Sequence, residues 1–478
     1  MQRVLKIYLR IVLIVLLLSF FVLPTTASKG IIGFCLVTAL MCALYFFVYE
    51  KKSLRWHSWI TPSTILVISL LIVYYQWLLD YLVGYRTKYG FAYPQLMNHY
   101  AVISTVGMIA LVEGYTFKNR KENINKKHFT TYGNNFFLVT LQVILFALFV
   151  YNINVTDFLT GNDYSGTHAL GVFTYIEYFL QAVNIAIMIS AINKSSKENT
   201  SLGAFIGSIP VLSIIVMSLY LILRLFSGDR GPVIDTVLAL FFSYLYYSKR
   251  KFSLPVIIVT VFIGAYGVSL LGMARNYDTN QSFFDRMAEA ANVFSKSGRF
   301  EDSRSVSPAT LELAFSHLSY EVMVGGMVAD EDGYKYGTYQ LVALANTIPF
   351  FNGFLHRTFN LSKNQTSSSY YATYKYIGDN PTWGLGTNCM GDFFMDFGIW
   401  GVLLGMFVVG LAFRLVDQTL FVFDKSTVTS GMLAFAIVYA SKSLYIGRSN
   451  FLGEFKLFVF LLLILWVSSF FTGKKNVL

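Results

Sequence analysis

The sequence is divided into about twelve apolar runs separated by polar segments, and this pattern restricts the chain to one class of fold. About 20 consecutive apolar residues suffice for a helix to cross the hydrocarbon core of a membrane. With 55% hydrophobic and only 13% charged residues, the chain is predicted to be an all-α polytopic membrane protein with about 12 transmembrane helices. The predicted spans cover residues 5–23, 30–49, 60–79, 100–117, 135–152, 169–192, 204–225, 231–247, 254–273, 397–416, 428–446 and 451–472.

Basic residues occur in every second loop between these spans. They precede the first span and follow the second, fourth, sixth, eighth and twelfth: Arg3, Lys6, Arg10; Lys51, Lys52, Arg55; Lys118, Arg120, Lys121, Lys126, Lys127; Lys194, Lys197; Lys249, Arg250, Lys251; Lys474, Lys475. Because lysine and arginine accumulate on the cytoplasmic side, both termini are predicted to be cytoplasmic. The first span is interpreted as an uncleaved helix, because its apolar core is longer than that of a signal peptide. This topology accounts for the net charge of +11, so the charge does not indicate a nucleic acid partner.

A long insertion separates spans nine and ten and lies on the outer side by this alternation. Its interspersed aromatic and aliphatic residues favour a small ordered domain of short helices at the membrane face. The chain is therefore divided into transmembrane helices 1 to 9 at residues 1–273, an outer loop domain at 274–396 and helices 10 to 12 at 397–478.

The outer turn between spans seven and eight reads "SGDRGP" and carries charges that the topology does not require. Arg224 and Arg230 lie on the outer side, and Gly228 and Gly231 leave the backbone of the turn unobstructed. A proline follows Gly231, so a helix N-terminus is expected to direct its free N–H groups at the same point. We assign these residues and Asp229 to an anion site; the alternative is that Asp229 and Arg230 pair and cap the helix.

Three further arginines are expected on the outer side. Arg275 follows span nine, Arg357 lies beside His356 in the loop domain, and Arg448 lies in the turn between the last two spans. Arginine binds phosphate through two parallel hydrogen bonds and keeps its charge, so several of these residues suit a diphosphate. Contact with lipid headgroups is the alternative for any one of them.

A second motif, "GTNCMGDFFMDFGIWG", leads into span ten. Asp392 and Asp396 are four residues apart, so a helix would place both on one face near its N-terminus. They are candidates for the base that takes a proton from an acceptor, and Asn388 is assigned to substrate binding. Carboxylates at a helix start also complement the helix dipole, which is the structural alternative.

His317 and Glu321 share the same four-residue spacing in the loop domain and could supply a rival base, although a lone histidine is more often structural. The sequence contains no metal-binding, Walker or serine-esterase motif, so no cofactor or metal is predicted. We assign no chemistry to Cys35, Cys42 and Cys389, which form no paired motif.

Together, the "SGDRGP" turn, the long outer loop and the second motif resemble the Wzy-type polymerases of O-antigen or capsule repeat units. Arg230 matches the arginine of the family's first motif. In the second motif of the family, a glycine followed by glutamate precedes aromatic-x-Asp-Phe-Gly. Asp396, Phe397 and Gly398 match that pattern, whereas Asp392 stands where the family has glutamate.

The resemblance implies a glycosyltransferase of the bacterial inner membrane with a GT-C-like helical bundle. Such an enzyme transfers a growing glycan from undecaprenyl diphosphate onto another lipid-linked repeat unit at the periplasmic face. The implied partners are these lipid-linked oligosaccharides, membrane lipids and a chain-length regulator protein, with no nucleic acid. The arginines would stabilise the charge growing on the diphosphate, while Asp392, Asp396 or His317 would accept the hydroxyl proton.

Two other functions are compatible with the sequence. An O-antigen ligase would use the same donor but transfer the polymer to a lipid A-core acceptor. A flippase or carrier for lipid-linked glycans would place its charges along a central cavity, whereas here they lie at the outer ends of the spans.

Overall fold

A computed structural model describes residues 2–53, 60–85, 91–117, 135–155, 158, 170–194, 201–227, 229–248, 267, 270, 283–297, 305–307, 310–349, 351–359, 366–379, 381, 384–423 and 427–471. Every regular element in these ranges is helical, which confirms an all-α protein. Six of the described helices are long and apolar enough to cross a membrane, and four shorter apolar helices accompany them.

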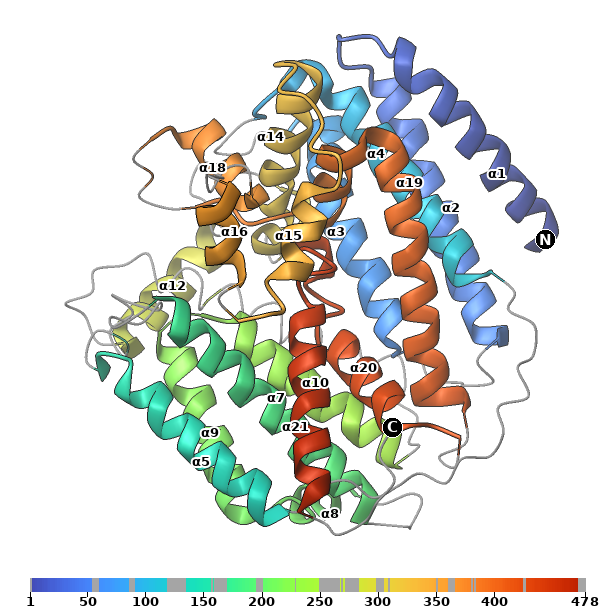
Figure 1. Cartoon of the computed structure of the whole chain (residues 1–478). Helices are drawn as coiled ribbons and strands as arrows, with labels where there is room; N and C mark the ends of the chain where they lie inside the picture. Colours follow the sequence, from blue (N-terminus) through green and yellow to red (C-terminus); the bar gives the residue numbers. More distant parts are fainter. Residues whose placement is uncertain are drawn as a thin grey trace.

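The first helical group combines the N-terminal helices with a late one, α19 (Figure 1). Its members are α1 (Gln2–Ser19), α2 (Lys29–Ser53), α3 (Pro62–Val83), α4 (Met97–Tyr115) and α19 (Cys389–Asp417). A Cβ atom on Gly114 of α4 would overlap the backbone oxygen of Phe407, and one on Gly410 of α19 would overlap that of Leu111. The two backbones are therefore in direct contact, as small residues permit between membrane helices.

The second group lies beside the first and contains most of the remaining apolar helices (Figure 1). Its members are α5 (Asn135–Tyr151), α7 (Leu170–Lys194), α8 (Leu202–Gly207), α9 (Val211–Phe226), α10 (Gly231–Ser248), α20 (Ser430–Ser441) and α21 (Phe455–Phe470). Here α7 packs against α5, α10 and α21.

The helices of the predicted loop domain are short and gather at one end of the molecule (Figure 1). They are α12 (Phe283–Ser297), α13 (Leu311–Ala314), α14 (Ser316–Val328), α15 (Thr338–Ala345), α16 (Phe351–Phe359) and α18 (Ser368–Ile377). Nearly every residue of α14 is buried, because this helix packs against α3, α18 and α19. Short 3-10 turns at Pro94–Leu96 (η2) and Ile446–Arg448 (η5) lie at the same end.

Two predicted spans differ from the helices that form. The span predicted at 204–225 is broken into α8 and α9, because Pro210 lacks the N–H that a continuous helix needs. The span predicted from 397 begins at Cys389 and is kinked at Phe397 and Gly398, where Gly398 has φ 61° and ψ −149°. The span predicted at 254–273 lies almost entirely outside the described residues.

Candidate functional site

Arg230 and Arg448 come from distant parts of the chain and lie close enough for their charges to interact. Arg230 directly precedes α10, and Arg448 ends η5 with its guanidinium carbon 5.7 Å from the centre of the Tyr445 ring. Burial lowers the pKa of both arginines, and the positive charge of Arg230 lowers the pKa of Arg448 further. Because two neighbouring guanidinium groups repel each other, an anion bound between them would relieve that repulsion.

Asp229 caps the helix that follows this arginine. One of its carboxylate oxygens accepts a hydrogen bond from the Gly231 N–H at 3.3 Å, and the other lies 3.4 Å from a guanidinium nitrogen of Arg224. The negative charge of Asp229 also acts on Arg230. The cap that sequence reasoning held as an alternative is therefore present, and Asp229 also forms an ion pair with Arg224.

Arg224 is buried, with 1% of its side chain exposed. It forms an ion pair with Glu177 of α7, and its guanidinium carbon lies 5.2 to 5.5 Å from the ring centres of Phe149, Phe158 and Phe173. These contacts join α5, α7 and α9, and they give Arg224 a structural explanation beside the predicted role in anion binding.

Asn388 and Asp392 organise the start of α19. The side-chain oxygen of Asn388 accepts hydrogen bonds from the Gly391 N–H at 3.0 Å and from the Tyr74 hydroxyl at 2.6 Å, which makes Asn388 the N-cap. Asp392 is 1% exposed and accepts hydrogen bonds from the Thr387 hydroxyl at 2.7 Å and the Asn450 amide at 2.8 Å. Asn450 is two residues beyond Arg448, so Asp392 supports the turn that carries the arginine.

Asp396 is fully buried and caps a different helix. Its carboxylate oxygens accept hydrogen bonds from the backbone N–H groups of Tyr339 at 3.3 Å and Gln340 at 3.2 Å, in the first turn of α15. The kink that follows at Phe397 and Gly398 interrupts the helical hydrogen bonding, and the carbonyl groups of Met395 and Asp396 instead accept hydrogen bonds from residues 335 and 336. The second motif therefore attaches the loop domain to α19.

His317 and Glu321 are both fully buried on α14. The imidazole Nε2 lies 3.4 Å from a Glu321 oxygen, Nδ1 lies 3.1 Å from the Val73 carbonyl oxygen, and Glu321 accepts a hydrogen bond from the Ala92 N–H at 2.8 Å. Burial lowers the pKa of His317 to about 4 and raises the pKa of Glu321 well above its usual value. Burial therefore disfavours the charged form of both groups, and they join α14 to α3 and to the segment before η2.

Residues 8–475 match the family described as O-antigen polysaccharide polymerase Wzy. The chain belongs to this family. It is therefore a multi-pass membrane protein of the O-antigen repeat-unit polymerases, with the glycosyltransferase type of activity that the family implies. Neither the curated proteins nor the solved structures contain a match.

One charged cluster beside the Wzy arginines was missed by sequence reasoning. Lys442, at the end of α20, lies 2.7 Å from a carboxylate oxygen of Asp235 and 3.2 Å from one of Glu454. Asp235 follows Arg230 by five residues, and Lys442 precedes Arg448 by six, so this cluster holds the two arginine-bearing segments together. The sequence did contain a signal for this cluster, because Asp235 and Lys442 lie inside predicted spans, where charged residues are usually functional or paired.

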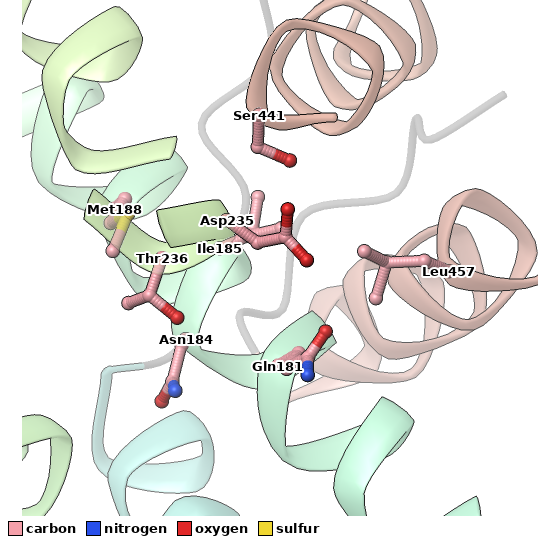
Figure 2. A pocket seen from close by; sticks show the side chains of 8 residues that line it. All are labelled: Gln181, Asn184, Ile185, Met188, Asp235, Thr236, Ser441 and Leu457. Atoms are coloured by element: carbon pink, nitrogen blue, oxygen red, sulfur yellow. The ribbon is translucent and has the colours of Figure 1, made fainter. Parts of the chain in front are cut away.

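A small cavity adjoins this cluster. It measures about 10 Å³, roughly the space for one water molecule, and is lined by Gln181, Asn184, Ile185, Met188, Asp235, Thr236, Ser441 and Leu457. Figure 2 shows the Asp235 carboxylate directed into it. One oxygen of Asp235 has no hydrogen-bond partner among the described residues, so a water molecule would complete its coordination.

The remaining predicted residues are one exposed arginine and three that the structure does not describe. Arg357 is exposed on α16, while Gly228, Arg275 and the side chain of His356 lie outside the described residues. Within the described ranges, no three histidine, cysteine, aspartate or glutamate side chains are grouped as metal ligands would be.

Proposed function

We propose that this chain polymerises undecaprenyl-diphosphate-linked repeat units at the outer face of the bacterial inner membrane. The observation that carries the proposal is the proximity of Arg230 and Arg448 in a chain of the Wzy family. A diphosphate carries the charge and the paired oxygen atoms that two guanidinium groups bind well. The proposed orientation has both termini in the cytoplasm and residues 274–396 in the periplasm.

In the proposed reaction, an acceptor hydroxyl oxygen bonds to the anomeric carbon of the donor glycan while the bond from that carbon to the carrier diphosphate breaks. The arginine pair stabilises the negative charge that develops on the leaving diphosphate. The Lys442 cluster and the Asp229 cap hold the segments that carry Arg230 and Arg448 in place. The two arginines therefore need little rearrangement when charge develops on the diphosphate.

The base that takes the hydroxyl proton is proposed to be Asp392 or Asp396, with His317 as the rival. Each of these side chains also makes a structural contact that competes with this role. Asp392 binds the Asn450 amide, Asp396 binds the start of α15, and His317 binds the Val73 carbonyl group. A general base contributes about 10² to 10⁴ in rate. If Asp392→Asn and Asp396→Asn enzymes make polymer at the wild-type rate, both carboxylates are rejected, and a defect in His317→Ala would move the assignment there.

The proposed function is tested by incubating the purified protein with lipid-linked repeat units that are extracted from the cells in which the protein occurs. The products are expected to form a ladder of longer glycans on a gel. In cells, deletion of the gene should leave surface glycan with single repeat units. Loss of all attached glycan would indicate a ligase, and accumulation of repeat units on the cytoplasmic side would indicate a flippase. A change in chain length when a regulator protein is removed would support that partner.

A further inference from the structure

The segment between α14 and α15, residues 329–337, has an unusual backbone and an unusual surface. Glu331 has φ 55° and Tyr336 has φ 49°, values that residues other than glycine rarely adopt. The side chain of Tyr336 is nevertheless large and 78% exposed. Strained backbone conformations cluster at active sites and ligand-binding segments, and they persist only where neighbouring contacts maintain them.

Contacts on both sides hold this segment in place. On the α19 side, the backbone N–H groups of Lys335 and Tyr336 donate to the carbonyl oxygens of Met395 and Asp396, both at 2.9 Å. The second set of contacts involves the acidic end of the segment. Lys375 of α18 lies 3.1 Å from Asp330 and 2.9 Å from Asp332, and these carboxylates also accept hydrogen bonds from the hydroxyls of Tyr93 at 2.6 Å and Tyr371 at 2.5 Å.

Three aromatic side chains surround the kink of α19, and we call them the tyrosine surface: Tyr334, Tyr336 and Phe397. Tyr334 is 38% exposed and Phe397 is 52% exposed. The Tyr334 ring lies against Gly398, where an added Cβ atom would be 3.1 Å from it, and the Phe397 ring lies equally close to Gly337. The rings are therefore packed against rigid backbone and still present area to the outside.

The chemistry around the tyrosine surface favours a sugar. Pyranose rings present C–H faces that stack on aromatic rings, and their hydroxyl groups donate to carboxylates and exchange hydrogen bonds with phenols. Asp330, Glu331 and Asp332 supply three carboxylates, against the two ammonium groups of Lys335 and Lys375. An excess of negative charge disfavours the phosphates of an anionic membrane surface.

We propose that the tyrosine surface binds the sugar residues of the lipid-linked oligosaccharide while Arg230 and Arg448 hold its diphosphate. This proposal rests on the proposed polymerase function. A continuous set of contacts connects the two regions, because Asn450 near Arg448 donates to Asp392, and Asp396, one turn later, accepts from the start of α15.

The test uses the full chain in detergent and two probes from the cells in which the protein occurs. One probe is the O-polysaccharide freed of lipid, and the other is the lipid-linked repeat unit. Loss of one stacking ring should weaken binding roughly tenfold. Tyr336→Ala is expected to weaken polysaccharide binding and to raise KM for the repeat unit by this factor, with kcat nearly unchanged. Tyr336→Phe, which keeps the ring, should retain most of the affinity. The matched control is Tyr151→Ala, because Tyr151 is 80% exposed at the end of α5.

A further variant separates binding from structure. Tyr336→Gly should raise the thermal unfolding temperature, because glycine adopts φ 49° without strain, while it loses affinity as Tyr336→Ala does. A tyrosine with only a structural role would lose stability instead. The proposal is overturned if Tyr336→Ala binds the polysaccharide as the wild type does, or if Tyr151→Ala shows the same loss, which would indicate general membrane anchoring. Wild-type enzyme that binds polysaccharide in a Tyr336-dependent way but makes no polymer would refute the polymerase function alone.

Discussion

Arg230 of the first motif and Arg224, which precedes that motif, are six residues apart and have different surroundings. Arg224 is buried against three phenylalanine rings and Glu177, whereas Arg230 is partly exposed at a helix start and interacts with the charge of Arg448. A buried arginine with a carboxylate partner is already compensated. Arg230 is therefore the stronger candidate for holding a diphosphate.

Replacement of Arg230 tests this assignment at the level of one side chain. Removing one fixed donor from a developing charge typically costs about 10² to 10³ in rate. Arg230→Ala should therefore reduce turnover by that factor in a polymerisation assay with purified enzyme, and Arg230→Lys should restore little because lysine cannot form two parallel hydrogen bonds. Arg3→Ala, an exposed arginine near the N-terminus, is the control. Wild-type turnover in Arg230→Ala would show that this residue is not required.

The His317 and Glu321 pair makes a prediction about pH. The pKa of His317 falls from 6.5 to about 4 on folding, and the pKa of Glu321 rises above 4.5. The lowered pKa of His317 makes the unfolded chain bind more protons, so this residue makes stability rise with pH between about 4 and 6.5. The raised pKa of Glu321 makes the folded chain bind more protons, so this residue makes stability fall as pH rises above 4.5. The two effects on stability therefore oppose each other.

Single substitutions should reveal the two opposing terms. In Glu321→Gln, the unfolded state alone takes up a proton on His317, so stability should fall as pH decreases from 6.5 to 4, by about 3 kcal/mol at most. In His317→Gln, stability should instead be greatest below pH 4.5 and fall as pH rises. Thermal unfolding in detergent measures both, as the difference from the wild type. Difference curves that do not change with pH would contradict these two opposing pKa shifts.

At the scale of elements, α19 connects the two helical groups with the loop domain. Its first half carries the Asn388 cap, Asp392 and Asp396, and its second half lies in backbone contact with α4. The kink at Gly398 changes the direction of the helix between these halves, and it frees the two carbonyl groups that bind the 329–337 segment. One helix thus sets both the membrane packing and the position of the proposed sugar-binding segment.

The close contact between α4 and α19 predicts that a substitution of Gly410 destabilises the protein, whereas a control substitution of Gly33, away from this contact, does not. Gly410→Ala should destabilise the protein, because its Cβ would overlap the backbone oxygen of Leu111 and neither backbone can move aside easily. Gly33→Ala in α2 meets no atom within 4 Å, so it should be neutral or stabilising by up to about 1 kcal/mol through helix propensity. Thermal unfolding of both variants checks this, and equal unfolding temperatures would refute the close contact.

At the scale of the whole molecule, two contacts fix the relative direction of α1 and α4. The Ser28 N–H, in the segment after α1, donates to the side-chain oxygen of Asn98 at the start of α4, whereas Arg10 of α1 pairs with Glu113 near the end of α4. These two helices therefore run in opposite directions. Which end faces outward is predicted from charge alone.

Labelling with an impermeant thiol reagent determines the orientation. The three native cysteines are buried and should not react. Thr358→Cys, exposed on α16, should be labelled from outside in spheroplasts, whereas Arg3→Cys should react only after the membrane is lysed. The opposite result would reverse the topology and would place the arginine pair on the side where the proposed transfer does not occur.

The sequence by itself determined the class of fold, most of the helix positions and the two motifs, because hydropathy and turn residues act locally along the chain. It also predicted that arginines from separate turns converge on one anion. Arg230 and Arg448 are near enough for their charges to interact, and the anion site itself stays a prediction. It did not predict the break at Pro210 or the early start of α19 at Cys389. Both depend on caps and kinks within apolar stretches that hydropathy does not resolve.

Only the tertiary structure decided the partners of each charged side chain. Arg224 faces Glu177, Asp396 caps α15, and Lys442 joins Asp235 to Glu454. Helices that are apolar on all sides carry no stripe that tells which face meets which neighbour. Their neighbours are set by close packing of small residues and by the few buried polar pairs, and these act between residues that are far apart in the sequence.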